Sequence, residues 1–242
     1  MRTIKSVIGL LFLFPILSCS QVDFNKIGKE INNTVNSGTP LSNQEIIDGL
    51  KEALSYGSKN ASGSASKVDG FFKNNIIKIP FPPEAAAVES KLRSLGMNKQ
   101  VDDFVLTINR AAEEAAKQAA PIFVDAVKGM TITDGLNILN GADTAATGFL
   151  RQRTNSQLQT KFTPVVHSAV QKVDVTKYWS PLINTYNKLP FVTKMNPDLD
   201  AYITQRALHG LFYLVSQEEI KIRKDPQARV TALLQKVFGS KH

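Results

Sequence analysis

A charged group within an alanine-rich stretch is the first place where this sequence could bind or transform a ligand. Arg110 lies three and four residues before Glu113 and Glu114, so the three side chains share one side of a helix. Such a group forms either a local ion pair or an anion site, in which neighbouring alanines let a ligand approach Arg110. In a hydrolase, Glu113 would instead be an acidic catalytic residue. The spacing favours the local ion pair.

A second polar stripe combines a carboxylate, hydroxyl groups and a guanidinium group. Asp143, Thr147 and Arg151 are spaced by four residues and share one face of a predicted helix, with Thr144 beside them. Together they could orient a polar substrate, with Asp143 as an acidic catalytic residue, whereas the small residues here could serve only close helix packing. We favour packing, and we expect any pocket to lie where Arg110 and this stripe meet.

The other residue types that bind metals or act as nucleophiles form no motif. The three histidines, His167, His209 and His242, are not at metal-ligand spacing, so we expect no metal. The sequence has neither a nucleophile elbow nor a phosphate-binding glycine loop, and no cofactor is expected. We interpret His209 as a core histidine with one hydrogen bond, because it falls in the most apolar helical pattern.

The only cysteine, Cys19, follows a short apolar run near the start of the chain. The run covers residues 7–17, and Arg2 and Lys5 precede it. Crossing a bilayer takes about 20 apolar residues, so the run predicts a secretory signal peptide over residues 1–18. The residues up to Cys19 resemble a bacterial lipobox, in which the cysteine thiol is acylated. The alternative is a free thiol after an ordinary secretory signal.

Acylation of Cys19 predicts where the protein lies. The acyl chains of this lipoprotein class would attach it durably to a membrane. Ser20 and Gln21 follow without the Asp that retains enteric lipoproteins in the inner membrane, so we expect an outer-membrane lipoprotein of the bacterial cell envelope. Export disfavours nucleic acid as a partner. Without residues 1–18 the side-chain charge is 27 minus 21, or +6, which favours an anionic envelope ligand or a protein partner.

Apolar residues recur every three or four positions along most of the mature chain, which predicts helices. We expect a tether with a short helix over residues 19–40 and a single helical domain over residues 41–240. Residues 57–66 fit either a loop or a close-packed helix. Pro121 is expected to kink or divide a helix. The most apolar helix, residues 199–215, is expected at the centre of the core.

A proline-rich stretch interrupts the helical pattern. Three prolines within residues 80–83 exclude helix and favour an extended backbone. The apolar residues of this stretch either pack across helix ends or line a ligand groove, and we favour packing. The sequence therefore predicts an all-α fold, an irregular multi-helix bundle with one extended Pro-rich segment.

Five ordered segments carry a resemblance to a known family. They are residues 42–54, SNQEIIDGLKEAL; residues 77–83, IKIPFPP; residues 109–113, NRAAE; residues 143–147, DTAAT; and residues 207–212, ALHGLF. Together they resemble the domain of unknown function 4197 family over about residues 40–238. The resemblance implies an exported, often lipid-anchored bacterial protein that is mostly helical, and it implies no activity.

Two functions follow as hypotheses. The favoured one is a non-enzymatic, lipid-anchored envelope protein whose helical body binds or scaffolds a partner. The alternative is an envelope hydrolase, or an enzyme that processes a small ligand, using acidic and Arg residues. A carboxylate with a perturbed pKa in a pocket beside Arg110 or Arg151 would favour the enzyme. An exposed apolar groove near Phe81 would favour the binding protein.

Overall fold

The computed structural model describes residues 42–94, 96–172 and 198–239, together with residues 179, 183–184, 187–188, 190 and 194. These residues belong to the compact unit Gly38–His242. The predicted signal peptide, Cys19 and the tether with its short helix lie outside the described residues.

Regular structure in the described part of the chain is entirely helical, so the predicted all-α, multi-helix class is confirmed. The α-helices are α2 (Asn43–Ala65), α3 (Ala86–Ser94), α4 (Asn98–Ala116), α5 (Ala119–Lys128), α6 (Ile132–Leu139), α7 (Ala145–Val170), α9 (Leu199–Lys224) and α10 (Ala232–Gly239). Short 3-10 turns cover Pro83–Ala85 and Pro226–Ala228. None of these helices is both long and apolar enough to cross a membrane.

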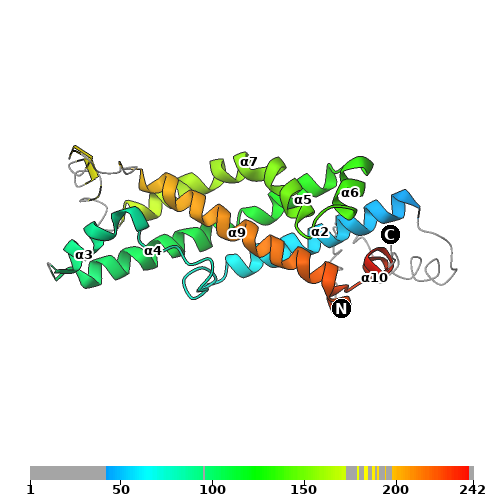
Figure 1. The fold of residues 1–242 in the computed structure, drawn as a ribbon, viewed down its shortest axis with the longest axis horizontal. Helices are drawn as coiled ribbons and strands as arrows, with labels where there is room; N and C mark the ends of the chain where they lie inside the picture. The colour runs from blue at the N-terminus through cyan, green and yellow to red at the C-terminus, as the bar shows by residue number, and fades with distance from the viewer. Residues whose placement is uncertain are drawn as a thin grey trace, which may run out of the picture. The chain divides into compact units, whose positions relative to one another are not determined.

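Helix α9 is the central helix of the bundle, as its apolar pattern predicts. It packs against α2, α4 and α7, and Figure 1 shows it running alongside α2 and α7. Ile203, Ala207 and Leu211 are fully buried on it. The start of α7 meets the end of α9, where Thr147 bonds Glu219, so the two helices are antiparallel.

Helix α2 begins at a capping box and ends later than its apolar pattern requires. The Ser42 hydroxyl accepts from the Glu45 backbone N–H, and the Glu45 carboxylate accepts from the Ser42 N–H at 2.7 Å. Residues 57–66, for which the sequence leaves loop and helix open, continue the helix to Ala65. Their small side chains allow close packing, because a Cβ added at Gly57 would lie 3.3 Å from the Cβ of Glu218 on α9.

Pro121 divides a helix, as expected. Its ring would clash with the carbonyl group four residues earlier, that of Lys117, if the helix continued. Helix α4 ends at Ala116, Lys117 and Gln118 form a turn, and α5 begins at Ala119. The proline lies in the first turn of α5, where no helical N–H is lost.

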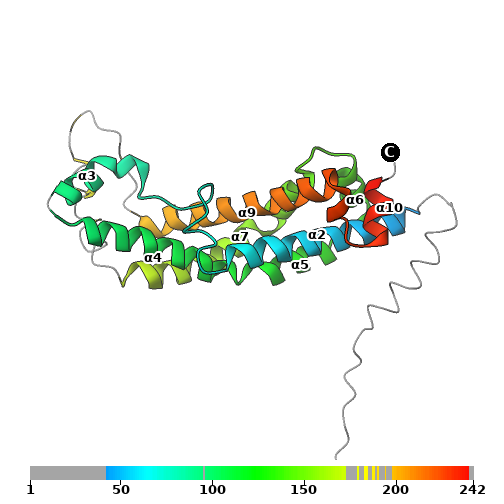
Figure 2. The ribbon, with the colours of Figure 1, turned by 90° about the horizontal axis from the view of Figure 1, so that it is seen from below.

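The segment 66–82 connects α2 to the first 3-10 turn without helix, and Figure 2 shows it beside α9 and α4. Its apolar residues Phe71, Ile77, Ile79 and Phe81 are buried, so the packing interpretation of the Pro-rich stretch is confirmed. The Phe81 ring meets the edge or face of Phe104 and Trp179, at centroid distances of 5.3 and 5.7 Å. Phe81 is only 4% exposed, so among the described residues it does not line an exposed groove.

Candidate functional site

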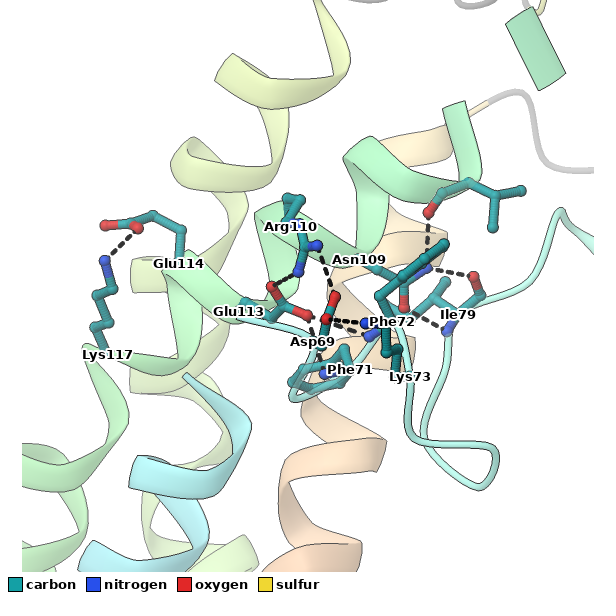
Figure 3. Close-up of polar contacts among 11 residues, drawn as sticks. Asp69, Phe71, Phe72, Lys73, Ile79, Asn109, Arg110, Glu113, Glu114 and Lys117 are labelled. Atoms are coloured by element: carbon teal, nitrogen blue, oxygen red, sulfur yellow. Dashed lines mark hydrogen bonds and ion pairs between the residues drawn. The ribbon is translucent and has the colours of Figure 1, made fainter. Parts of the chain in front are cut away.

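Polar side chains of α4 hold the segment 66–82 in place (Figure 3). The Asn109 carboxamide is fully buried and bonds both backbone groups of Ile79: its oxygen accepts from the N–H at 2.9 Å, and its nitrogen donates to the carbonyl at 2.8 Å. The same nitrogen donates to the carbonyl of Val105. One amide side chain thus satisfies both backbone groups of Ile79, which belongs to no helix or strand.

Glu113 performs the same task one turn further along α4. Its Oε1 accepts hydrogen bonds from the backbone N–H groups of Phe71 and Phe72, at 3.1 and 3.2 Å. Its Oε2 accepts from Arg110 Nη1 at 2.6 Å. The side chain is only 5% exposed. Both carboxylate oxygens are therefore used inside the fold, and Glu113 does not point into an open site.

Arg110 joins this helix to the segment by a second ion pair. Its Nη2 lies 2.7 Å from Asp69 Oδ1, and Lys73 lies 2.8 Å from the other oxygen of Asp69. Hydrogen bonds from Lys73 and Arg110 hold the pKa of Asp69 below its usual value. Hydrogen bonds to Glu113 and Asp69 raise the pKa of Arg110. The predicted local ion pair is thus present with Glu113, whereas Glu114 bonds Lys117 instead.

The residues of the second predicted stripe lie partly before α7 and partly on α7. Helix α7 begins at Ala145, so Asp143 precedes the helix and does not share a helical face with Thr147 and Arg151, contrary to our expectation. Asp143 pairs with Lys224 at 2.5 Å, which lowers its pKa. Thr144 occupies the N-cap position of α7 without a side-chain cap bond. The helix starts two residues later than the four-residue spacing assumes.

Glu219 of α9 caps α7 from outside. Its carboxylate accepts from the N–H of Ala146 at 2.9 Å and from both the N–H and hydroxyl of Thr147 at 2.8 Å. Arg223 donates to the same carboxylate and to the carbonyl of Ile138 on α6. This network binds the ends of three helices and fully occupies Glu219.

Sequence reasoning did not select Glu219 or Arg223. A signal was present, since Glu219 follows Leu211 and Val215 at steps of four on the buried face of α9, and Arg223 follows four residues later. An acid on an apolar face requires a partner. The partners here are backbone N–H groups of another helix, which the spacing of residues cannot identify.

Arg110 and the second predicted stripe do not come together in the structure. Arg110 faces Pro164 and Val165 near the end of α7, whereas Thr147 lies about 27 Å away along that helix, at 1.5 Å per residue. Arg151 places its guanidinium group over the Phe212 ring of α9, 4.8 Å from the centroid. A shared pocket of Arg110 with the second stripe is therefore absent from the described structure.

An open groove of about 500 Å³ runs between α4 and α7. Arg110 and Lys172 contribute its positive charges, and Ala111, Val165 and Ala169 contribute apolar surface. A second cavity, beside Glu219 and Ser58, has a volume of about 20 Å³, which is room for about one water molecule. Only the first of these two has the size of a small-molecule site.

The two histidines within the described residues, His167 and His209, do not add a reactive centre, and His242 lies outside them. His167 Nδ1 lies 2.5 Å from Asp200 Oδ2 on the surface between α7 and α9. His209 is exposed, so its interpretation as a core histidine is wrong: it lies between the buried residues Leu208 and Gly210 but points off the apolar face of α9. Within the described ranges, no group of three His, Cys, Asp or Glu side chains is arranged to hold a metal ion.

Comparison with known proteins gives one match. A family model described as "Protein of unknown function (DUF4197)" matches residues 40–239. No curated protein and no solved structure matches the chain.

Proposed function

The chain belongs to the DUF4197 family, and from its own residues we propose that it is a lipid-anchored, non-enzymatic binding protein of the bacterial cell envelope. The acyl group is attached at Cys19, and the helical body binds its ligand in the groove between α4 and α7. The outer membrane is the proposed location, because Ser20 and Gln21 follow the cysteine.

One observation favours binding over catalysis. The acidic residues considered for catalysis are occupied: Glu113 accepts two backbone N–H groups and Arg110, and Asp143 is paired with Lys224. A general acid at neutral pH needs a raised pKa, whereas the pKa of Asp143 is lowered. The groove, in contrast, holds side chains that are not fully used by the fold.

Membrane fractionation tests the anchor. The wild-type protein should be found in the membrane fraction and should incorporate labelled fatty acid. Cys19→Ser should remove the label, because the thiol that carries the acyl group is gone. Incorporation of label by the Cys19→Ser protein, or a native Cys19 without acyl groups by mass spectrometry, would contradict the proposal.

Site-specific photo-crosslinking in cells tests the groove. A photoreactive amino acid at Ser168, which lines the groove, should give a discrete product whose added mass identifies the ligand. The matched control is the same amino acid at Ser156, an exposed position on the same helix. Identical products from the two positions would show that the groove has no ligand of its own.

A further inference from the structure

We propose that the groove between α4 and α7 binds an anionic amphiphile, a molecule with a phosphate or carboxylate head group and an apolar chain. The inference rests on the proposed binding function and names its ligand class. The groove volume of about 500 Å³ lies within the range of about 300–1,000 Å³ typical of small-molecule sites.

Arg110 supplies a head-group contact that the fold has already oriented. Its side chain is 37% exposed, and its two ion pairs fix it from the side of Glu113 and Asp69. A guanidinium group has five N–H donors, and these pairs use one bond from each terminal nitrogen. Donors remain for an anion, and little side-chain entropy is lost when it binds.

Lys172 supplies the second cation. It lies on the turn that follows α7, in the lining of the groove, and its side chain is exposed. Glu114 also lines the groove, but its carboxylate is directed to Lys117 at 2.5 Å and away from Arg110 (Figure 3). Of the charged side chains that line the groove, Lys172 and the exposed part of Arg110 are therefore the ones that a ligand meets.

The surroundings of the groove strengthen this charge. From Thr144 to Lys172 the sequence contains no Asp or Glu, while Arg151, Arg153, Lys161 and Lys172 fall in this range. Helix α7 thus contributes cationic side chains and no carboxylate of its own to the field around the groove. Neutral ligands gain nothing from this field, which is why we assign an anion.

The remaining lining fits an apolar chain. Ala111, Val165 and Ala169 present short apolar side chains, and Pro164 has no N–H to satisfy. Thr107 and Ser168 place hydroxyl groups at the margin. From Pro164 to Lys172 the groove extends about 12 Å along α7, enough to cover part of an acyl chain beside its head group.

Calorimetric titration tests the inference on the mature chain, residues 19–242, carrying Cys19→Ser, so that neither an acyl group nor the apolar run of residues 7–17 competes for the probes. The probes are decyl phosphate, decanoate, neutral decyl glucoside and inorganic phosphate, each below its micelle concentration. Each methylene removed from water contributes about fourfold in affinity. We expect at least one anionic decyl probe to bind, and to bind at least about a hundredfold more tightly than inorganic phosphate.

Two pairs of variants locate the binding. Lys172→Gln should weaken binding about tenfold, the value of one charge-assisted hydrogen bond, whereas Lys161→Gln removes the same charge outside the groove and should change it less than about twofold. Ser168→Trp fills the groove and should abolish binding, whereas Ser156→Trp should not. All four positions are exposed, so the variants should fold.

Each outcome of the titrations supports or overturns the proposed anionic amphiphile. Preference for the phosphate or for the carboxylate probe supports the inference and identifies a phospholipid-like or a fatty-acid-like ligand. Equal affinity for the neutral glucoside, equal effects of Lys172→Gln and Lys161→Gln, or no binding of any probe would overturn it. The proposed function would survive that failure if Cys19 still anchors the protein and Ser168 still gives its own crosslinked product.

Discussion

Glu113 is a carboxylate placed almost entirely inside the protein in order to serve backbone groups. Removing it by Glu113→Ala should lower the free energy of unfolding by about 3 kcal/mol, because the N–H groups of Phe71 and Phe72 lose their acceptor and each unsatisfied buried donor costs about 1–3 kcal/mol. Urea unfolding at neutral pH measures the change.

The adjacent residue is the control for that experiment. Glu114 is exposed and pairs only with Lys117, so Glu114→Ala should cost less than about 1 kcal/mol. Glu113→Gln keeps an acceptor oxygen and should lose less stability than Glu113→Ala. Equal effects of Glu113→Ala and Glu114→Ala would show that the segment 66–82 does not depend on the buried carboxylate.

The ionisation of Asp69 makes the stability of the folded protein depend on pH. Its pKa is lowered by hydrogen bonds from Lys73 and Arg110, so the folded state keeps the carboxylate ionised to a lower pH than the unfolded chain does. The resulting stability is complete above the unfolded pKa of about 3.9 and is lost as pH falls through the lower, folded pKa. Asp69→Asn should therefore be less stable than wild type at pH 7, by a difference that shrinks in acid.

Asparagine is the appropriate substitution because Asp69 has a φ of +68°, a left-handed conformation that Asn tolerates. Urea midpoints measured from neutral to acid pH give the difference. Asp69→Ala adds backbone strain and should show a further loss that does not vary with pH. A difference between Asp69→Asn and wild type that is constant with pH would refute the role of the ion pairs.

At the scale of elements, the segment 66–82 packs closely against α9 at Gly210. A Cβ at Gly210 would lie 2.8 Å from Phe71 Cε1 and 3.0 Å from the Cβ of Ile77. Gly210→Ala should thus destabilise the protein by about 1–3 kcal/mol, despite the better helix propensity of alanine. Thermal unfolding measures the effect.

Gly148 on α7 is the matched control, because an added Cβ there would meet nothing within 4 Å. Gly148→Ala should stabilise the protein by about 0.5–1 kcal/mol through helix propensity alone. If both variants gained stability, the contact between α9 and the segment would be looser than the structure describes.

At the scale of the whole molecule, periodicity and local signals predicted most of the elements. The apolar pattern of residues 199–215 indicated the central helix, and Pro121 marked a helix division. Each of these features acts within one or two helical turns. They are accordingly readable from neighbouring residues.

The candidate site was less predictable, because its bonds join residues distant in the sequence. Arg110 and Glu113 were selected from their spacing, but their partners Asp69 and Phe71 are about 40 residues away. The groove depends on how α4 and α7 pack, which no single helical pattern specifies. Asp143 was misplaced because the start of α7 is fixed by Glu219, which is 72 residues beyond Thr147.

That distant cap has a consequence for the growing polypeptide. A ribosome that has just finished the codons for α7 has not yet made the carboxylate that satisfies the amides of Ala146 and Thr147. Until Glu219 has been made, only water can satisfy these amides, so the first turn of α7 gains its cap late in synthesis.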